Sequence, residues 1–174
     1  KLQKFLIPRT PTFCSGCQYI AAYRILETAL KGEKYYILNG DVGCHEMAGF
    51  GLEKTKGLAN NSIQNKIYKS RWISELIDTD YSMGASIAIA EGQIKAGYRA
   101  GKVIALIGDS TFFHAGIPAL LNAVRSQTNL LVIIFDNSWT AMTGHHPHPG
   151  SYLDSYKKPA KQIVIGDVVR ALGV

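Results

Sequence analysis

Apolar residues occur in short runs along the chain, and their spacing predicts the secondary structure of each run. Residues 103–107 and 130–135 are continuous β-branched apolar runs that end abruptly in polar residues, as buried parallel strands do. Residues 114–127 repeat apolar side chains at helical spacing, with a proline where a first turn would be. Together the three stretches predict a strand–helix–strand unit.

The remaining patterned stretches predict elements of the same kinds. A short apolar run favours a strand at 35–38, and a stretch rich in alanine and isoleucine favours a closely packed, buried helix at 83–97. Helices are also predicted at 20–30 and 167–172, each followed closely by a glycine. We therefore expect an α/β fold, a mostly parallel sheet with helices on both faces, in one domain over 1–174. We also expect the sheet to be incomplete at its C-terminal end, with a final strand missing or supplied by another chain.

Three stretches have no clear period. Residues 1–12 hold two prolines and predict an arm laid over the surface or over a partner. Residues 48–68 mix glycine, asparagine and lysine and predict an irregular connection. Residues 140–150 are rich in glycine and proline and predict a loop over a ligand site.

Charge and composition narrow the functional classes. The chain has 19 Lys and Arg against 13 Asp and Glu, giving a net charge of +6 over 174 residues. Because these cations are scattered, with no basic stripe or interleaved aromatics, an anionic small molecule fits better than nucleic acid or a membrane. No run reaches the roughly 18 apolar residues of a membrane span and no signal-peptide pattern begins the chain, so we expect a cytoplasmic protein. Three cysteines are too few for a disulfide framework and favour free thiols or metal ligation.

Polar residues follow both strands of the central unit. A Gly-Asp-Ser turn at 108–110 follows the first strand, and Asp136 with Asn137 follows the second. Because the carboxyl ends of parallel strands share one sheet edge, a carboxylate and an amide oxygen meet there, and such ligands select Mg²⁺. Mg²⁺ completes its shell with phosphate oxygens and water, so we expect a bound diphosphate, with the backbone N–H groups of Ser110 and Thr111 as further donors. The alternative is a simple turn with a satisfied helix cap.

Four stretches resemble one enzyme family: GDSTFFHAGIPALLNAV, DNSWTAMTGHHPHPG, FCSGCQ and GDVGCHE. Together they are similar to the thiamine-diphosphate-binding domain of indolepyruvate ferredoxin oxidoreductases, within the 2-oxoacid:ferredoxin oxidoreductase family. The resemblance runs from about Pro8 to the last residue. It implies a thiamine-diphosphate-binding fold that holds thiamine diphosphate and Mg²⁺. It also implies oxidative decarboxylation of an aryl 2-oxo acid such as indolepyruvate, with electrons passed to ferredoxin.

The resemblance also implies which residues contact the cofactor. These are Gly43, Cys44, Gly108, Asp109, Ser110, Thr111, Asn137, Trp139, Thr143 and Gly144. Of these, Asp109, the Asn137 side chain and the main-chain carbonyl of Trp139 are expected to ligate Mg²⁺. Ser110, which replaces the commoner third glycine of the family motif, is expected to contact phosphate oxygens with Thr111. Gly43 and its loop are expected near the thiazolium or aminopyrimidine.

This chain is not expected to be active alone. In the resembled family a glutamate from a partner domain activates the aminopyrimidine, and neither Glu46 nor Glu91 lies in a matching motif. We therefore assign no catalytic residue and expect a partner domain or subunit to complete the site. The resemblance adds a 2-oxo-acid substrate, coenzyme A and ferredoxin as partners.

The cysteines leave three interpretations. Cys14 and Cys17 have metal-ligand spacing, and Cys44 is expected at the same sheet edge. The resemblance implies a [4Fe-4S] cluster on these three thiolates, with a fourth cysteine further downstream than this chain extends. A zinc site with His45 as fourth ligand and ordinary unligated thiols are the alternatives.

The histidine-rich run at 145–148 is interpreted as a polar lid, with substrate contact or proton relay by one of its histidines as the alternative. His114 is interpreted either as a phosphate contact or as a packing residue at the helix start. Two other functions stay open at this point. One is a non-oxidative thiamine-diphosphate decarboxylase or carboligase, and the other is a Cys-rich metal-binding interaction module.

Overall fold

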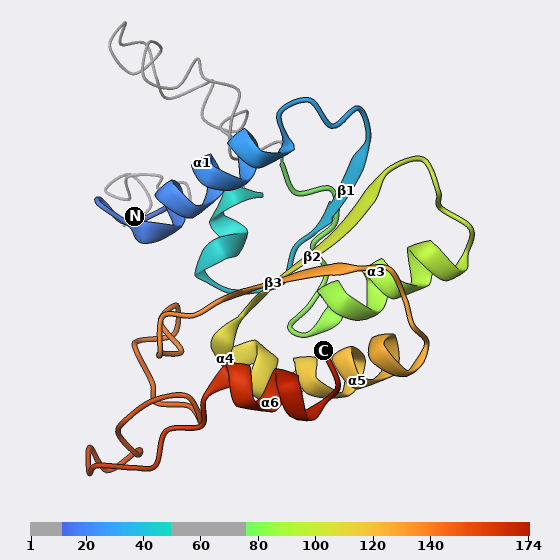
Figure 1. Ribbon diagram of the computed structural model, residues 1–174. Coiled ribbons are helices and arrows are strands. Elements are labelled where there is room, and N and C mark those ends of the chain that lie inside the picture. Colours follow the sequence, from blue (N-terminus) through green and yellow to red (C-terminus); the bar gives the residue numbers. More distant parts are fainter. Residues whose placement is uncertain (1–11, 50–75) are drawn as a thin grey trace, which may run out of the picture.

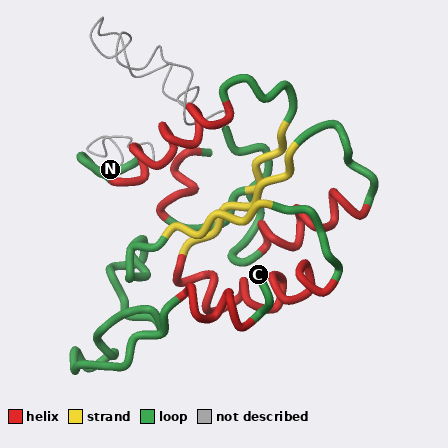
Figure 2. Tube along the Cα trace, viewed as in Figure 1, coloured by secondary structure: helices red, strands yellow, loops and turns green. Residues whose placement is uncertain are grey.

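Residues 12–49 and 76–174 are described by the computed structural model, in which helices cover both faces of a parallel sheet (Figures 1 and 2). The strands are β1 (Tyr36–Asn39), β2 (Lys102–Gly108) and β3 (Leu131–Phe135), in the spatial order β1-β2-β3. The helices are α1 (Gln18–Leu30), η2 (Cys44–Ala48), α3 (Ala85–Lys95), α4 (Asp109–Thr111), η4 (Phe112–Gly116), α5 (Ile117–Arg125) and α6 (Ile165–Ala171). The expected α/β class is thereby confirmed.

The register of the sheet brings the strand ends together. Asn39 pairs with Ala105 at the end of β1, and Gly108 pairs with Phe135 at the end of β2 and β3. Since all three strands run in the same direction, the polar residues that follow them emerge at one edge. The candidate site lies at this edge.

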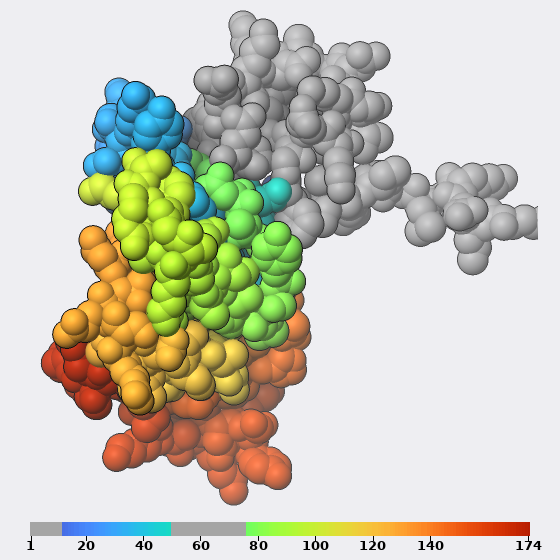
Figure 3. All heavy atoms as spheres, turned by 90° about the vertical axis from the view of Figure 1, so that its right-hand side faces the viewer, coloured from blue at the N-terminus to red at the C-terminus, as the bar shows by residue number. Residues whose placement is uncertain are grey.

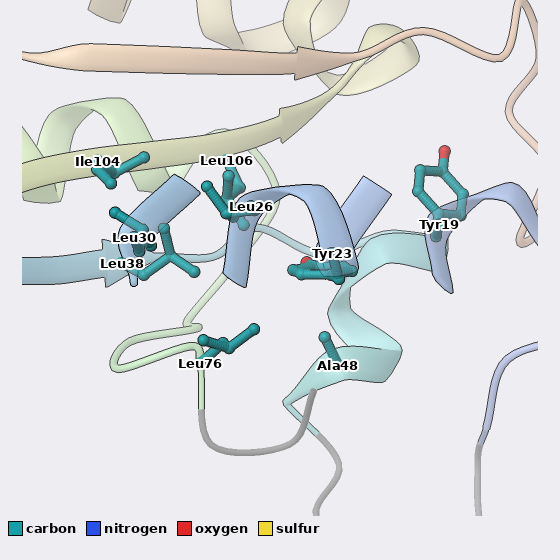
Figure 4. Close-up of a cluster of buried hydrophobic side chains, with 9 residues drawn as sticks. All are labelled: Tyr19, Tyr23, Leu26, Leu30, Leu38, Ala48, Leu76, Ile104 and Leu106. Atoms are coloured by element: carbon teal, nitrogen blue, oxygen red, sulfur yellow. The ribbon is translucent and has the colours of Figure 1, made fainter. Parts of the chain in front are cut away.

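One core lies between the sheet and α1. Ile104 and Leu106 of β2 point to this side, where they pack with α1 residues such as Leu26 and Leu30 and with Leu38 of β1 (Figure 4). The alternate β2 residues, Val103, Ala105 and Ile107, join a second core with α3 and α5 on the opposite face. Strict alternation on β2 thus explains why its continuous apolar run is buried on both sides.

The helix after β2 begins earlier than expected. The sequence predicted a helix from 114, whereas helical structure runs without a break from Asp109 through α4, η4 and α5. Residues Phe112–Gly116 form a π-helix, a widened turn that often occurs at functional sites. A Cβ on Gly116 would lie 2.7 Å from Ile107 Cδ1, so a larger residue here would require the Ile107 side chain to shift. The Asp-Ser-Thr residues are therefore the first helical turn and not a loop before it.

Three further expectations are corrected in part. β3 is only partly buried, because it lies at one edge of the three-stranded sheet. The expected buried helix, α3, buries one face, including Ile87 and Ala90, and exposes the other. The loop expected around Gly43, residues 39–46, is irregular only in its first part, because η2 begins at Cys44.

The chain after β3 leaves the sheet before it returns as α6. Figures 1 and 3 show the segment 136–164 (orange to red) at the lower end of the molecule. Within the described ranges, no helix is long and apolar enough to cross a membrane. Residues 1–11 of the expected arm and residues 50–68 of the expected irregular connection lie outside the described residues.

Candidate active site

A cleft of about 80 Å³ opens at the carboxyl ends of the strands. Its walls come from the start of α1, the loop after β1, the start of α4 and the loop after β3. The expected cofactor residues in its lining are Gly43, Cys44, Gly108, Asp109, Ser110, Thr111, Asn137, Trp139 and Thr143. Gly144, also expected there, is not part of the lining and lies in a turn with φ +110°.

Asp109 is the buried carboxylate of the cleft, with 2% of the residue exposed. Its Oδ1 accepts the Ser110 backbone N–H at 2.8 Å, and its Oδ2 accepts the Asn137 backbone N–H at 3.0 Å. His148 Nε2 lies 3.1 Å from the same Oδ2. Burial raises the pKa of the Asp109 carboxyl, the backbone hydrogen bonds lower it, and the Asp136 carboxyl raises it. A bound cation would offset the unfavourable burial of this charge.

The Asn137 side chain is oriented by two hydrogen bonds. Its Nδ2 donates to the Tyr19 hydroxyl at 2.7 Å, and its Oδ1 accepts the Trp139 backbone N–H at 2.9 Å. Figure 4 shows Tyr19 at the edge of its cluster, with the hydroxyl directed away from the other labelled side chains. Burial raises the pKa of the Tyr19 phenol and the Asp109 charge raises it further, so the hydroxyl stays protonated. Asn137 Oδ1 keeps one lone pair for another partner.

Ser110 connects the start of α4 to the loop after β3. Its Oγ lies 2.6 Å from Thr140 Oγ1 and 3.3 Å from His114 Nδ1. His114 Nδ1 also lies 2.7 Å from the Ser110 carbonyl oxygen, and it must be the donor there because a carbonyl only accepts. His114 is not part of the cleft lining, so its contacts favour the packing interpretation over a phosphate contact.

His45 is a buried histidine in the cleft wall. Its ring packs against Tyr19 and Phe135, with centroid distances of 6.3 Å and 5.6 Å. Burial lowers the pKa of this imidazole to about 4, against the effect of a hydrogen bond to the Asp41 backbone, so the ring is neutral at pH 7. Its Nε2 has no partner among the described residues. A Cβ on Gly43 would lie 2.9 Å from the His45 ring, which explains the glycine at this position.

The three cysteines occupy one region of the molecule. Cys14 and Cys17 precede α1, and Cys44 opens η2; all three are free thiols. Burial raises the pKa of the Cys44 thiol, and the neighbouring Cys17 and Cys14 raise it further. Over residues 12–49 and 76–174, no group of three His, Cys, Asp or Glu side chains is arranged to hold a metal ion. A cluster on these thiols therefore stays a prediction.

The loop at 140–150 is only partly the polar lid that its sequence suggests. The backbones of Thr140 and His146 pair through hydrogen bonds of 2.8 Å and 3.1 Å. His145 and His146 are exposed, whereas His148 is buried against Asp109. The histidine run therefore divides into surface residues and one residue of the site interior.

A family model described as "Thiamine pyrophosphate enzyme, C-terminal TPP binding domain" matches residues 41–174, which hold almost all of this cleft. The chain belongs to this family. Thiamine pyrophosphate, also called thiamine diphosphate, is thus the cofactor of the domain. The match begins just after β1 and spans β2 and β3, the strands that precede Asp109 and Asn137.

Curated relatives of this TPP-binding domain include proteins named "Indolepyruvate oxidoreductase subunit IorA". The chain is 35% identical to that of Archaeoglobus fulgidus over 96% of its length and 36% identical to that of Methanothermobacter marburgensis over 95%. These matches cover 23% and 24% of the two relatives, so the chain spans about a quarter of their length.

A solved structure has the same fold as this TPP-binding domain. It is titled 2-oxoglutarate:ferredoxin oxidoreductase from Magnetococcus marinus with 2-oxoglutarate, coenzyme A and succinyl-CoA bound. The TM-score is 0.70 at 17% identity, over 98% of this chain and 54% of the other. At this identity the likeness concerns the fold alone.

Two side chains that contact Asp109 or Asn137 in the TPP-binding domain's site were not expected from the sequence to do so. Tyr19 lies among the apolar residues of α1, where a buried tyrosine is usually assigned to the hydrophobic core. His148 lies in an irregular loop beside two exposed histidines, and local pattern does not distinguish the three. Only the position of each relative to Asn137 or Asp109 reveals its contact.

Proposed function

We propose that this chain is the thiamine-diphosphate-binding part of a 2-oxo-acid:ferredoxin oxidoreductase that decarboxylates an aryl 2-oxo acid such as indolepyruvate. The observation that carries the proposal is the buried Asp109 carboxylate after β2, held by the backbone of Asn137 after β3. The names of the relatives support the substrate class and the redox chemistry. When bound, thiamine diphosphate supplies the electron sink through which a 2-oxo acid loses CO₂.

Mg²⁺ fits the donor set of the cleft. No Lys or Arg lines the cleft in the described part of the chain, so a diphosphate there needs another positive charge. The Asp109 carboxylate and the Asn137 amide oxygen are hard oxygen ligands of the kind Mg²⁺ prefers. We assign these two side chains to the metal, with the Trp139 carbonyl as a third ligand. Ser110 and Thr111 would then contact phosphate oxygens.

A [4Fe-4S] cluster would draw on the three cysteines. Cys14 and Cys17 lie close enough to Cys44 to raise the pKa of its thiol, which supports a shared site for the three. Such clusters usually take four thiolates, so the fourth ligand would come from elsewhere in the complete protein. The cluster would carry electrons from the cofactor to ferredoxin.

The remaining parts of the site would come from a partner domain or subunit. Glu46 accepts the Gly43 N–H at 3.2 Å, and Glu91 pairs with Lys95 at 2.5 Å, outside the cleft. We therefore place the activating glutamate on the partner, with coenzyme A and ferredoxin as further partners of the assembled enzyme. Its cytoplasmic location and the one-domain organisation of this chain stay predictions.

Cofactor binding by the complete enzyme tests the metal assignment. Thiamine diphosphate binding is measured by equilibrium dialysis with Mg²⁺ and after chelation, in the parent, Asp109→Ala and Asp41→Asn. Asp41 is a matched control, because it is a buried carboxyl after β1 that bonds the Gly84 N–H at 2.9 Å instead of lining the cleft. We expect binding to require Mg²⁺, to be lost in Asp109→Ala and to persist in Asp41→Asn. Undiminished binding by Asp109→Ala would contradict the assignment.

Product analysis tests the reaction. A panel of aryl and aliphatic 2-oxo acids is supplied with coenzyme A and ferredoxin under anaerobic conditions. We expect CO₂ release, ferredoxin reduction and acyl-CoA formation, with the fastest turnover on aryl substrates. Aldehyde formation without ferredoxin reduction would instead identify a non-oxidative decarboxylase.

A further inference from the structure

His148 contacts the Asp109 carboxylate through a side chain that is fully buried. Its side chain has no exposed surface, and its Nε2 lies 3.1 Å from Asp109 Oδ2. The Gly150 backbone N–H donates to His148 Nδ1 at 3.0 Å, so Nδ1 is an acceptor. A neutral imidazole whose Nδ1 accepts carries its hydrogen on Nε2, which makes Nε2–H the donor to Asp109.

The loop around His148 is built to hold this donor in place. The His148 backbone N–H donates to Ser151 Oγ at 3.0 Å, and Ser151 Oγ in turn donates to the Ser138 carbonyl. A Cβ on Gly150 would lie 2.8 Å from both His148 Cε1 and Phe113 Cε2. The imidazole is therefore held by hydrogen bonds at both ring nitrogens and by its ring contact with Phe113 of the π-helix, at a centroid distance of 5.7 Å.

The hydrogen bonds to Asp109 leave one of its carboxylate oxygens open to a further partner. A carboxylate oxygen has about two acceptor positions. On Oδ2 both are used, by the Asn137 N–H and the His148 Nε2–H. On Oδ1 one is used, by the Ser110 N–H, and one is open. Asp109 can therefore offer a cation one oxygen and not two.

We propose that His148 is a positioning residue that keeps Asp109 a one-oxygen ligand and thereby favours Mg²⁺ over Ca²⁺ in the cofactor site. Mg²⁺ requires near-ideal octahedral geometry with few protein ligands, whereas Ca²⁺ takes six to eight oxygens and readily accepts bidentate carboxylates. Without the His148 donor, Asp109 Oδ2 becomes free to swing toward the metal. This inference rests on the proposed metal site, and it adds how that site discriminates between cations.

The test is cation selectivity in the complete enzyme, read as cofactor binding instead of turnover. Thiamine diphosphate binding is followed by equilibrium dialysis while either Mg²⁺ or Ca²⁺ is titrated. His148→Leu removes the donor at similar volume, His148→Gln keeps an N–H donor at a comparable reach, and His146→Leu is the matched exposed control. Thermal unfolding of each metal-free variant reports any general loss of structure.

We expect His148→Leu to weaken the affinity for Mg²⁺ about 10- to 100-fold, the usual effect of removing a residue that orients a metal ligand. The affinity for Ca²⁺ should fall far less. The ratio of Mg²⁺ affinity to Ca²⁺ affinity should return toward the parental value in His148→Gln and equal the parental value in His146→Leu. Equal weakening of both cations in His148→Leu, or an unchanged ratio, would overturn the positioning role while leaving the metal site intact. Metal-independent cofactor binding by the parent would overturn the proposed metal site itself.

Discussion

The Tyr19 hydroxyl on α1 accepts a hydrogen bond of 2.7 Å from the Asn137 side-chain amide, 118 residues further along the chain. This contact joins the first helix to the turn that follows β3. It leaves the other end of the amide, Oδ1, turned to the Trp139 backbone and the cleft. A side chain just before the helix predicted at 20–30, and inside α1 as observed, therefore orients a proposed metal ligand.

Tyr19→Phe should weaken thiamine diphosphate binding in Mg²⁺ by roughly 10-fold, because the Asn137 amide loses the acceptor that orients it. It should also lower the free energy of unfolding by about 1 kcal/mol, the usual net value of one hydrogen bond. Tyr23→Phe is the matched control on the same helix, since its hydroxyl donates to the His45 carbonyl at 2.9 Å. Dialysis and chemical unfolding should show similar stability losses, with weaker cofactor binding in Tyr19→Phe alone. Equal weakening in both variants would argue against the orienting role.

Asp41→Asn should change how stability depends on pH. Burial raises the pKa of the Asp41 carboxyl from 3.8 to about 6, although the Gly84 backbone N–H lowers it. Between these two values the folded chain keeps a proton that the unfolded chain releases, so this group makes the fold less stable as pH rises. The asparagine variant has no carboxyl to titrate at this position, so its stability should not show this fall with rising pH. Urea unfolding of both proteins at intervals from pH 4 to pH 7 measures the difference.

The difference between the two curves is the informative quantity, because His45 acts in the opposite sense. Its pKa is lowered from 6.5 to about 4, so it destabilises the fold as pH falls through that range. This contribution is present in parent and variant alike and cancels in the subtraction. A difference that stays constant with pH would mean that the Asp41 pKa is not raised in the folded chain.

Gly150→Ala should lower stability by about 1–3 kcal/mol, since the added methyl would overlap the His148 and Phe113 rings and force a shift. It should also weaken Mg²⁺-dependent cofactor binding by displacing His148 from Asp109. Gly92→Ala is the control, because a Cβ at that position of α3 meets no atom within 4 Å. In a helix interior that change should stabilise by roughly 0.5–1 kcal/mol. Chemical unfolding compares the stability of the two variants, and dialysis compares their cofactor binding. Unchanged stability of Gly150→Ala would contradict the close packing, and unchanged binding would contradict the displacement of His148 from Asp109.

The sequence by itself determined the elements and the edge on which the site lies. The runs at 103–107 and 130–135 predicted two parallel strands whose polar ends meet, because apolar continuity and strand polarity are local properties of the chain. The resemblance of four motifs predicted the cofactor. Of the residues that it placed at the cofactor, all but Gly144 line the cleft. Where the helix after β2 begins was misjudged, because the Asp-Ser-Thr segment carries no apolar period.

Only the tertiary structure decided which residues hold the site in shape. Tyr19 and His148 contact Asn137 and Asp109 across 118 and 39 residues of sequence, and side-chain direction over such separations is set by packing. The same is true of β3, whose exposure depends on its place at the edge of the sheet and not on its composition. Local chemistry therefore predicted the two side-chain ligands of the proposed metal site and the resemblance implied the third, whereas long-range packing determined how the Asp109 and Asn137 side chains are oriented.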